Sequence, residues 1–234
     1  MNIDILNMAK SYREEEYRLK WEGTFAEYLE IVKERPEVAQ SAHSRVYNMI
    51  KSAGVKEKNG QKMYQFFGKE IFGLETALER LVEEYFHPAA RRLDVRKRIL
   101  LLMGPVSGGK STIVTLLKRG LEQYSRTDEG AVYAIKGCPM FEDPLHLIPH
   151  HLREEFYKEY GIRIEGSLSP LNTMRLEKEY DGRIENVMVE RIFFSEDKRV
   201  GIGTFTPSDP KSQDIADLTG SIDFSTIAEF GSES

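Results

Sequence analysis

Hydrophobic residues in the first part of the chain recur at the three-to-four-residue spacing of amphipathic helices. Thr24 and Glu27 form a capping box, and the apolar stripe that follows them predicts a helix that ends before Pro36. A second stripe over residues 38–50 predicts another helix. Together these patterns predict a small helical N-terminal unit over residues 1–60.

Short apolar runs later in the chain predict β-strands. The run at residues 99–103 is continuous, Ile-Leu-Leu-Leu-Met, which is typical of a strand buried on both faces of a parallel sheet. Further strands are predicted at 131–135, 187–194 and 200–205, and a short one at 63–67.

Helical patterns separate these runs, over residues 74–85, 113–124, 143–160 and 169–181. Strands that alternate with helices predict an α/β fold with a mainly parallel sheet flanked by helices. We therefore expect a nucleotide-binding domain of this class over residues 61–234.

A glycine-rich pattern, G-x-x-x-x-G-K-[ST], lies between the apolar run at 99–103 and the helix that follows, which is the context of a phosphate-binding P-loop. Its glycines permit positive φ angles and let main-chain N–H groups approach phosphate oxygens. Lys110 is expected to contact the β- and γ-phosphates, and the Ser111 hydroxyl to bind magnesium. The alternative is a glycine-rich turn without a ligand, but the flanking elements favour the P-loop. The predicted site for ATP and Mg²⁺ comprises Gly104, Pro105, Val106, Ser107, Gly108, Gly109, Lys110, Ser111 and Thr112.

A P-loop ATPase also uses an acidic residue at the end of a neighbouring strand to hold the metal or its water. Glu196 and Asp197, which follow the predicted strand at 187–194, are the local candidates. Because Lys198 and Arg199 come directly after them, a solvated turn explains these charges equally well.

Other residues with chemical potential carry weaker patterns. His146 and His150 are four residues apart and His151 is adjacent. Pro149 interrupts the helix between them, and no clear carboxylate stands at ligand spacing, so we expect surface or packing histidines. Cys138 has no neighbouring signal of activation, and we expect a structural role. The chain lacks H-R-D and D-F-G patterns, which excludes the eukaryotic type of protein kinase.

Composition adds limits on compartment and partners. The 234 residues, 40% hydrophobic and 30% charged, suit one sizeable domain with a small extra unit. A net charge of −5 gives no global attraction to nucleic acid or to an anionic membrane, and the basic run at 91–98 is expected to be a solvated connection. No apolar run reaches membrane-spanning length, no signal peptide is visible, and a single cysteine suits a reducing compartment. We therefore expect a cytoplasmic protein.

Several long segments resemble the bacterial PrkA family, which is described as serine protein kinases built on an AAA+-type nucleotide-binding module. The segments that carry the resemblance are FFGKEIFGLE at 66–75, GPVSGGKST at 104–112, GCPM at 137–140, DPLHLIP at 143–149, RVGIGTF at 199–205 and KSQDI at 211–215. The resemblance implies that Ile71, Phe72 and Gly73 lie near the adenine base, although a loop-to-helix junction with a buried aromatic residue would also account for them. Family members are longer, so we expect their acidic strand, helical lid and kinase-like region beyond Ser234, and an incomplete domain here.

The resemblance implies phosphoryl transfer from Mg-ATP to a serine of a protein substrate. Two alternatives stay open: an AAA+ ATPase that remodels or regulates a partner protein without kinase activity, and a protein-binding module switched by nucleotide. AAA+ modules usually assemble as rings, so a homo-oligomer of the full-length protein is also expected.

Overall fold

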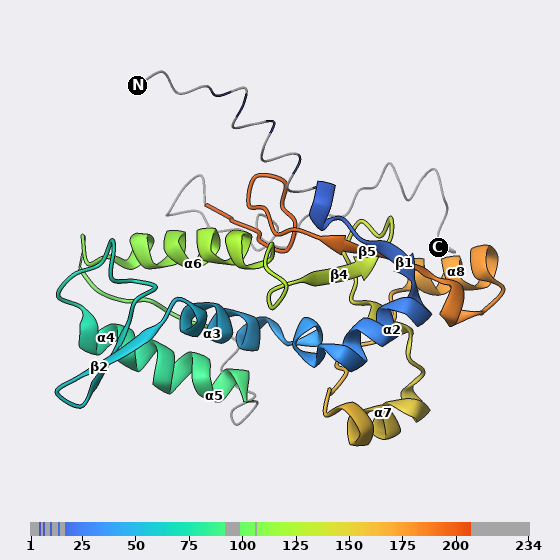
Figure 1. Cartoon of the computed structure of the whole chain (residues 1–234), viewed down its shortest axis with the longest axis horizontal. Helices are drawn as coiled ribbons and strands as arrows, with labels where there is room; N and C mark the ends of the chain where they lie inside the picture. The colour runs from blue at the N-terminus through green and yellow to red at the C-terminus, as the bar shows by residue number, and fades with distance from the viewer. Residues whose placement is uncertain are drawn as a thin grey trace, which may run out of the picture. The chain divides into compact units, whose positions relative to one another are not determined.

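The computed structural model describes Ile5, Asn7, Lys10, Glu14 and residues 17–91, 99–105 and 107–206. Residues 1–202 form one compact unit and residues 203–234 a second (Figure 1). Every helix and strand named below lies in the first unit. None of the helices in the described ranges is long and apolar enough to cross a membrane.

A three-stranded sheet forms the centre of one half of this unit, with β5 between its two neighbours. Both pairings are antiparallel, and they place Gly23 opposite Val189 and Ala134 opposite Glu190. The strands are β1 (Glu22–Thr24), β4 (Val132–Ile135) and β5 (Met188–Ile192). The predicted mainly parallel sheet is therefore absent from the described residues. Strand direction depends on where the intervening segments return the chain, and the local apolar pattern does not encode that.

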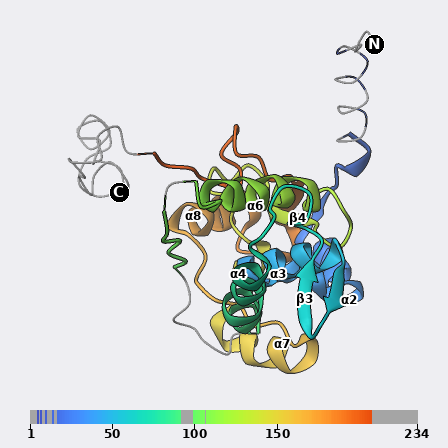
Figure 2. The same cartoon turned by 90° about the vertical axis from the view of Figure 1, so that its left-hand side faces the viewer.

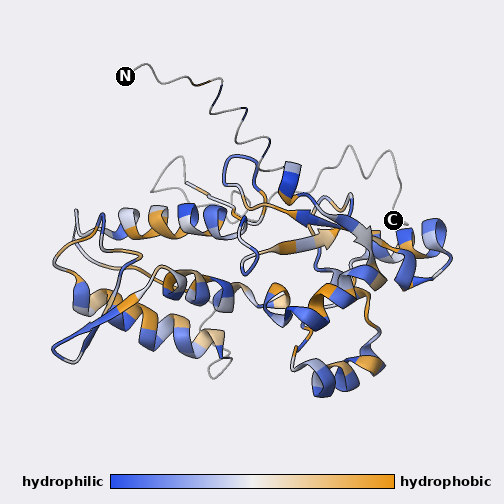
Figure 3. Cartoon of the chain, viewed as in Figure 1, coloured by the Kyte–Doolittle hydropathy of each residue, from blue (hydrophilic) through white to orange (hydrophobic). Residues whose placement is uncertain are grey.

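Helix α2 (Phe25–Glu34) begins at the predicted capping box, since Thr24 Oγ1 accepts from the Glu27 amide and the Glu27 carboxylate accepts from the Thr24 amide. Its buried face packs on the sheet and forms the first core cluster. The buried members of this cluster include Phe25, Tyr28, Val32, Tyr133, Ile135, Val187 and Val189. In Figure 3 the arrow of β4 is orange, which agrees with the burial of this strand.

The chain between β4 and β5 is mostly helical and flanks the sheet. Its elements are η3 (Pro144–Leu147), η4 (His150–Leu152), α7 (Arg153–Tyr160), α8 (Pro170–Tyr180) and η5 (Ile184–Asn186). The predicted ends of α8 are confirmed: Ser169 caps its first turn, and Asp181 adopts a left-handed φ of 52° just past its last residue. The predicted helical stretch over 143–160, broken at Pro149, consists of two short 3₁₀ turns followed by α7. Pro144 is the first residue of η3, and Pro149 immediately precedes η4.

A second core cluster joins the other helices of the unit. Met49 and Ile50 come from α3 (Ala42–Ser52), and Ile113 comes from α6 (Lys110–Tyr124). Leu78 and Val82 come from a continuous helical rod formed by α4, η2 and α5. Figures 1 and 2 both show α6 lying along α3 and this rod. The elements are α3 (Ala42–Ser52), the rod of α4 (Glu75–Arg80), the π-helical segment η2 (Leu81–Phe86) and α5 (His87–Ala90), and α6 (Lys110–Tyr124). A hairpin of β2 (Val55–Lys58) and β3 (Gln61–Tyr64) precedes the rod, and a 3₁₀ turn, η1 (Pro36–Ala39), precedes α3.

The predicted strand at 99–103 is wrong, because these residues form neither a strand nor a helix. Leu100 and Leu102 pack against the second cluster, whereas Ile99, Leu101 and Met103 are 86%, 74% and 82% exposed. The apolar run is thus covered on one face only. The predicted strand at 200–205 is also wrong, since only isolated bridges at Val200 and Gly201 join this segment to Ser195.

Contacts within the unit run across residue 60, where the sequence predicts a boundary. β1 pairs with β5, and α3 shares the second cluster with α6. The division into domains at residues 1–60 and 61–234 stays a prediction.

Candidate nucleotide-binding site

The predicted P-loop lies between the irregular segment 99–103 and the first turn of α6. Gly109 has φ 76° and is the residue immediately before α6, and Ser107 also has a left-handed φ of 64°. The Gly108 amide donates to the Pro105 carbonyl at 3.2 Å, which closes the turn. Val106 lies outside the described residues. This tight turn leads the chain into α6. The N–H groups of the first helical turn, which have no partner within the helix, therefore point toward the loop, where they could donate to a phosphate group.

Lys110 folds back over the loop. Its Nζ donates to the carbonyl oxygens of Gly104 at 2.8 Å and of Pro105 at 2.5 Å. The ammonium group is therefore held over the turn by main-chain acceptors that a phosphate oxygen could replace. Both partners belong to the loop itself, so Lys110 makes no described hydrogen bond to the core.

Ser111 and Thr112 form the next two positions of α6, and the Ser111 side chain is exposed. A hydroxyl on the first turn of the helix can serve as one oxygen ligand of magnesium beside a bound triphosphate. The residues present fit the triphosphate through the loop amides, Lys110 and the start of α6. Toward the metal, the side chains of residues 104–112 offer hydroxyl oxygens and no carboxylate.

The segment predicted to contact adenine adjoins the P-loop. A Cβ atom added to Gly109 would lie 3.2 Å from Leu74 Cδ1, so Leu74 touches the loop directly. Ile71 is buried in the cluster that contains Ile113 of α6, whereas Phe72 is 77% exposed. Gly73 has φ 74°, which turns the chain into α4. Leu74 belongs to the segment 66–75 that carries the family resemblance, although its proximity to Gly109 was not predicted; the adenine contact of residues 71–73 stays a prediction.

Of the acidic candidates for magnesium, which follow β5 in the chain, Glu196 contacts α6 away from the P-loop. Glu196 accepts a hydrogen bond from Lys118, and its amide donates to the Glu122 carboxylate at 2.8 Å. Lys118 is seven residues after Ser111, which is about 10 Å along a helix. The structure therefore brings Glu196 to the middle of α6 and not to the P-loop.

The histidines and the cysteine also have other contacts. His146 faces Glu142 and the Glu165 carbonyl, and His150 faces the Ser167 hydroxyl. Cys138 is buried and accepts from the Asn172 amide group. Within the described ranges, no three His, Cys, Asp or Glu side chains are placed to hold a metal ion.

A cleft of about 620 Å³ lies apart from this site, between the η1–α3 region and α7. Its lining includes Ser41, Asn48, Tyr157 and Arg163, and none of its lining residues belongs to the P-loop.

Comparison with known proteins agrees with the nucleotide-binding interpretation. Residues 23–234 match the family model described as the PrkA AAA domain. The chain is 80% identical over 232 residues to the "ATP-dependent protease PrkA" of Bacillus subtilis, covering 99% of this chain and 37% of that protein. It is 31% identical over 170 residues to the "Serine/threonine kinase YeaG" of Escherichia coli K12, covering 69% of this chain and 25% of that protein.

A third relative is the "Uncharacterized protein in gldA 5'region" of Geobacillus stearothermophilus, 74% identical over 97 residues, which are 42% of this chain and all of that protein. The chain thus spans about a third of its Bacillus relative and a quarter of its Escherichia relative. No solved structure matches the chain significantly.

Proposed function

The chain belongs to the PrkA AAA domain family, and on that premise we propose that it binds ATP with magnesium through residues 104–112. The observation that carries the proposal is the P-loop turn at the start of α6, where Lys110 is held over the loop by the Gly104 and Pro105 carbonyls. Lys110, the loop amides and the Ser111 hydroxyl would hold the nucleotide. Bound magnesium would supply positive charge opposite the β- and γ-phosphates.

The direct test is calorimetric titration of this chain with ATP and magnesium. Lys110→Ala is expected to weaken binding at least tenfold, because it removes the side-chain charge that faces the phosphates. The fold should persist, since the Lys110 side chain donates to two carbonyls of its own loop. Lys178→Ala, an exposed lysine in the last turn of α8, makes the same change in net charge and is expected to bind ATP as the parent does. Equal affinity of parent and Lys110→Ala would refute the P-loop assignment.

For the full-length protein we propose transfer of the γ-phosphoryl group from ATP to a serine of a protein substrate. The support is the name of the Escherichia relative together with the family match. In this reaction the bond from the γ-phosphorus to the β,γ-bridging oxygen breaks and a bond to the serine oxygen forms. ADP leaves with the electron pair, and the serine proton passes to a base.

A second candidate, ATP-dependent proteolysis, is favoured by the name of the 80% identical Bacillus relative. One experiment separates the candidates: full-length protein, γ-labelled ATP, magnesium and protein acceptors. Label on serine supports the kinase, whereas ATP-dependent cleavage of the acceptor without label supports the protease. Release of free phosphate with neither product would instead support an ATPase that remodels or regulates its partner.

These activities require a protein partner, and we propose that the full-length protein works in the cytoplasm, as a homo-oligomer. Sedimentation of full-length protein with and without ATP tests the assembly: a single monomeric species in both conditions would refute it.

A further inference from the structure

The cleft of about 620 Å³ beside α7 adjoins a second hollow of about 360 Å³. Tyr157 and Arg163 belong to the walls of both hollows, and the Arg163 guanidinium lies over the Tyr157 ring, 5.3 Å from its centre. We call the two hollows together the α7 groove. Figures 1 and 2 both show α7 on the opposite side of the unit from α6, so the groove is remote from the P-loop at the start of α6.

The walls of the first hollow are held in place by side-chain hydrogen bonds between elements. Ser44 Oγ donates to the Ala90 carbonyl at 2.9 Å, which joins α3 to the end of α5. Asn48 Nδ2 donates to Gln40 Oε1 at 2.8 Å, which joins α3 to the residue after η1. All four residues line the hollow. A site that is already formed spares a ligand the cost of ordering it.

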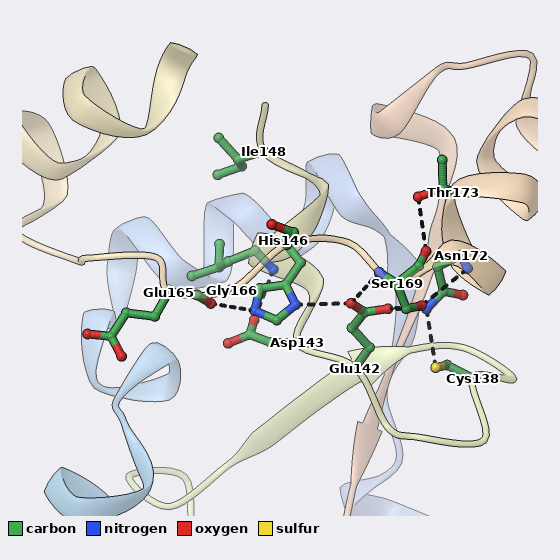
Figure 4. A network of polar contacts seen from close by, with 12 residues as sticks. Cys138, Glu142, Asp143, His146, Ile148, Glu165, Gly166, Ser169, Asn172 and Thr173 are labelled. Carbon is green, nitrogen blue, oxygen red and sulfur yellow. Dashed lines mark hydrogen bonds and ion pairs between the residues drawn. The ribbon is translucent and has the colours of Figure 1, made fainter. Parts of the chain in front are cut away.

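The second hollow is fixed in the same way. Arg153 lies in its wall and donates through Nη1 to the Gly166 carbonyl at 2.6 Å and through Nε to the Ile148 carbonyl at 2.9 Å. In Figure 4 the carbonyl of Glu165, the residue before Gly166, faces the His146 ring, with 2.8 Å between its oxygen and Nε2. The segment that carries Gly166 is therefore anchored from two sides.

The charged residues of the groove favour an anionic ligand. Besides His150, the basic side chains among the described lining residues are all arginines, although the chain as a whole has a net charge of −5. Arginine and tyrosine are enriched at protein interfaces whereas lysine is depleted, and a guanidinium matches the geometry of a carboxylate. The described lining includes three arginines and two glutamates: Arg91, Arg153 and Arg163, and Glu37 and Glu154.

We propose that the α7 groove binds an acidic segment of a protein partner in an extended conformation. Two hollows that meet at one pair of side chains suit a linear ligand, because a compact ion or small molecule would fill only one of them. The eight residues of α7 span about 12 Å, which four extended residues of a ligand cover. Acidic side chains of the segment face Arg91 and Arg163, and its main chain packs over Tyr157. The proposal depends on none of the activities proposed above.

Amide NMR of this chain tests the proposal with a defined probe, an acetylated and amidated eight-residue peptide of alternating Glu and Ser. The amides of Ile162 in the first hollow and Gly166 in the second are expected to shift together, with one dissociation constant. The matching peptide of Lys and Ser should shift neither. Equal responses to both peptides, a response in one hollow only, or no response up to about 5 mM acidic peptide would each overturn the proposal.

Inorganic phosphate is the second probe, because a site for small anions would also contain arginines. Phosphate is expected to leave both amides unshifted at concentrations where the acidic peptide binds. If phosphate alone shifts both amides and displaces the peptide, the groove binds a small anion and the proposal is wrong.

The variant Arg163→Glu reverses the charge where the two hollows meet and is expected to weaken peptide binding at least tenfold. Arg183→Glu is the matched control, since Arg183 is exposed and is not among the described lining residues, and it should bind as the parent does. Equal affinities of both variants would overturn the proposal. The unmodified chain gives an independent measurement: raising the salt concentration from about 0.05 to 0.5 M should weaken peptide binding at least fivefold through screening. An affinity that does not change with salt would refute recognition by charge even if Arg163→Glu does not fold.

Discussion

A buried arginine, Arg45 of α3, offers the sharpest test of how the two core clusters are joined. Only 5% exposed, it donates through Nη1 to the Gly130 and Ala131 carbonyls at 2.7 and 3.1 Å, and through Nη2 to the Val38 carbonyl at 3.1 Å. Burial lowers its pKa to about 10, so the guanidinium stays charged at neutral pH. One side chain thus ties α3 to η1 and to the start of β4.

Arg45→Met keeps much of the side-chain volume and removes every donor. Three carbonyls of buried residues then lose their partner, and each hydrogen bond to a charged group is worth about 1.5–3 kcal/mol. The contributions of the three hydrogen bonds are not additive, and removing the guanidinium also removes the cost of burying its charge. We therefore expect the free energy of unfolding to fall by about 3–5 kcal/mol. For a chain of this size that lowers Tm by roughly 10 °C.

Urea unfolding followed by tryptophan fluorescence measures this loss. The single tryptophan, Trp21, packs edge-on against Tyr133 with ring centres 5.3 Å apart, so it reports on the first core cluster. Arg80→Met is the matched control, because Arg80 is exposed and forms a surface ion pair with Glu84 one turn later; it should cost below about 1 kcal/mol. If the two variants are equally stable, the hydrogen bonds of Arg45 do not carry the connection.

Three further predictions concern helices. Thr24→Ala removes the capping hydrogen bond of α2 and should cost about 1 kcal/mol in urea unfolding; an unchanged midpoint would count against the capping box. The hydrogen bonds from Thr24 lower the pKa of Glu27, so the advantage of Glu27 over Glu27→Gln should be present at neutral pH. It should fade as the pH falls through the lowered value, and a constant difference from pH 7 to 3 would contradict this. Gly120→Ala in α6 would bring a Cβ within 2.6 Å of the Phe66 ring and 2.8 Å of Met49 Sδ. We expect about 1–3 kcal/mol of destabilisation by thermal unfolding, and a variant as stable as the parent would show that these side chains repack freely.

Short sequence patterns correctly predicted helix ends and strands whose formation depends on residues close together in the chain. The capping box at Thr24, the Ser169 cap and the helix after the P-loop all appear where the sequence predicts them. In each case the determining groups lie within one helical turn, such as a hydroxyl and the amide three residues later. Strand β4 is also confirmed, within one residue of its predicted start.

Pairing across the chain was not predictable in the same way. The apolar run at 99–103 predicted burial on both faces. Leu100 and Leu102 are packed against the second core cluster, but Leu101 on the other face stays exposed. β1 is three residues long, too short for a periodic signal, yet it pairs with β5 from the far end of the unit. The direction of a strand and the strand with which it pairs depend on contacts between distant segments. The local pattern of a single segment does not reveal those contacts.

The same distinction explains the candidate site. Residues 104–112 are contiguous, so their spacing alone indicates where the loop amides, Lys110 and Ser111 come together. The acidic residue of such a site must come from another segment, and Glu196, the local candidate, is instead held by Lys118 near the middle of α6. Since that ion pair and the Lys110 contacts share no residue, Lys110→Ala and Glu196→Gln should act independently. The first should reduce ATP affinity and the second should leave it unchanged in calorimetry; a matching loss in Glu196→Gln would place that carboxylate in the nucleotide site after all.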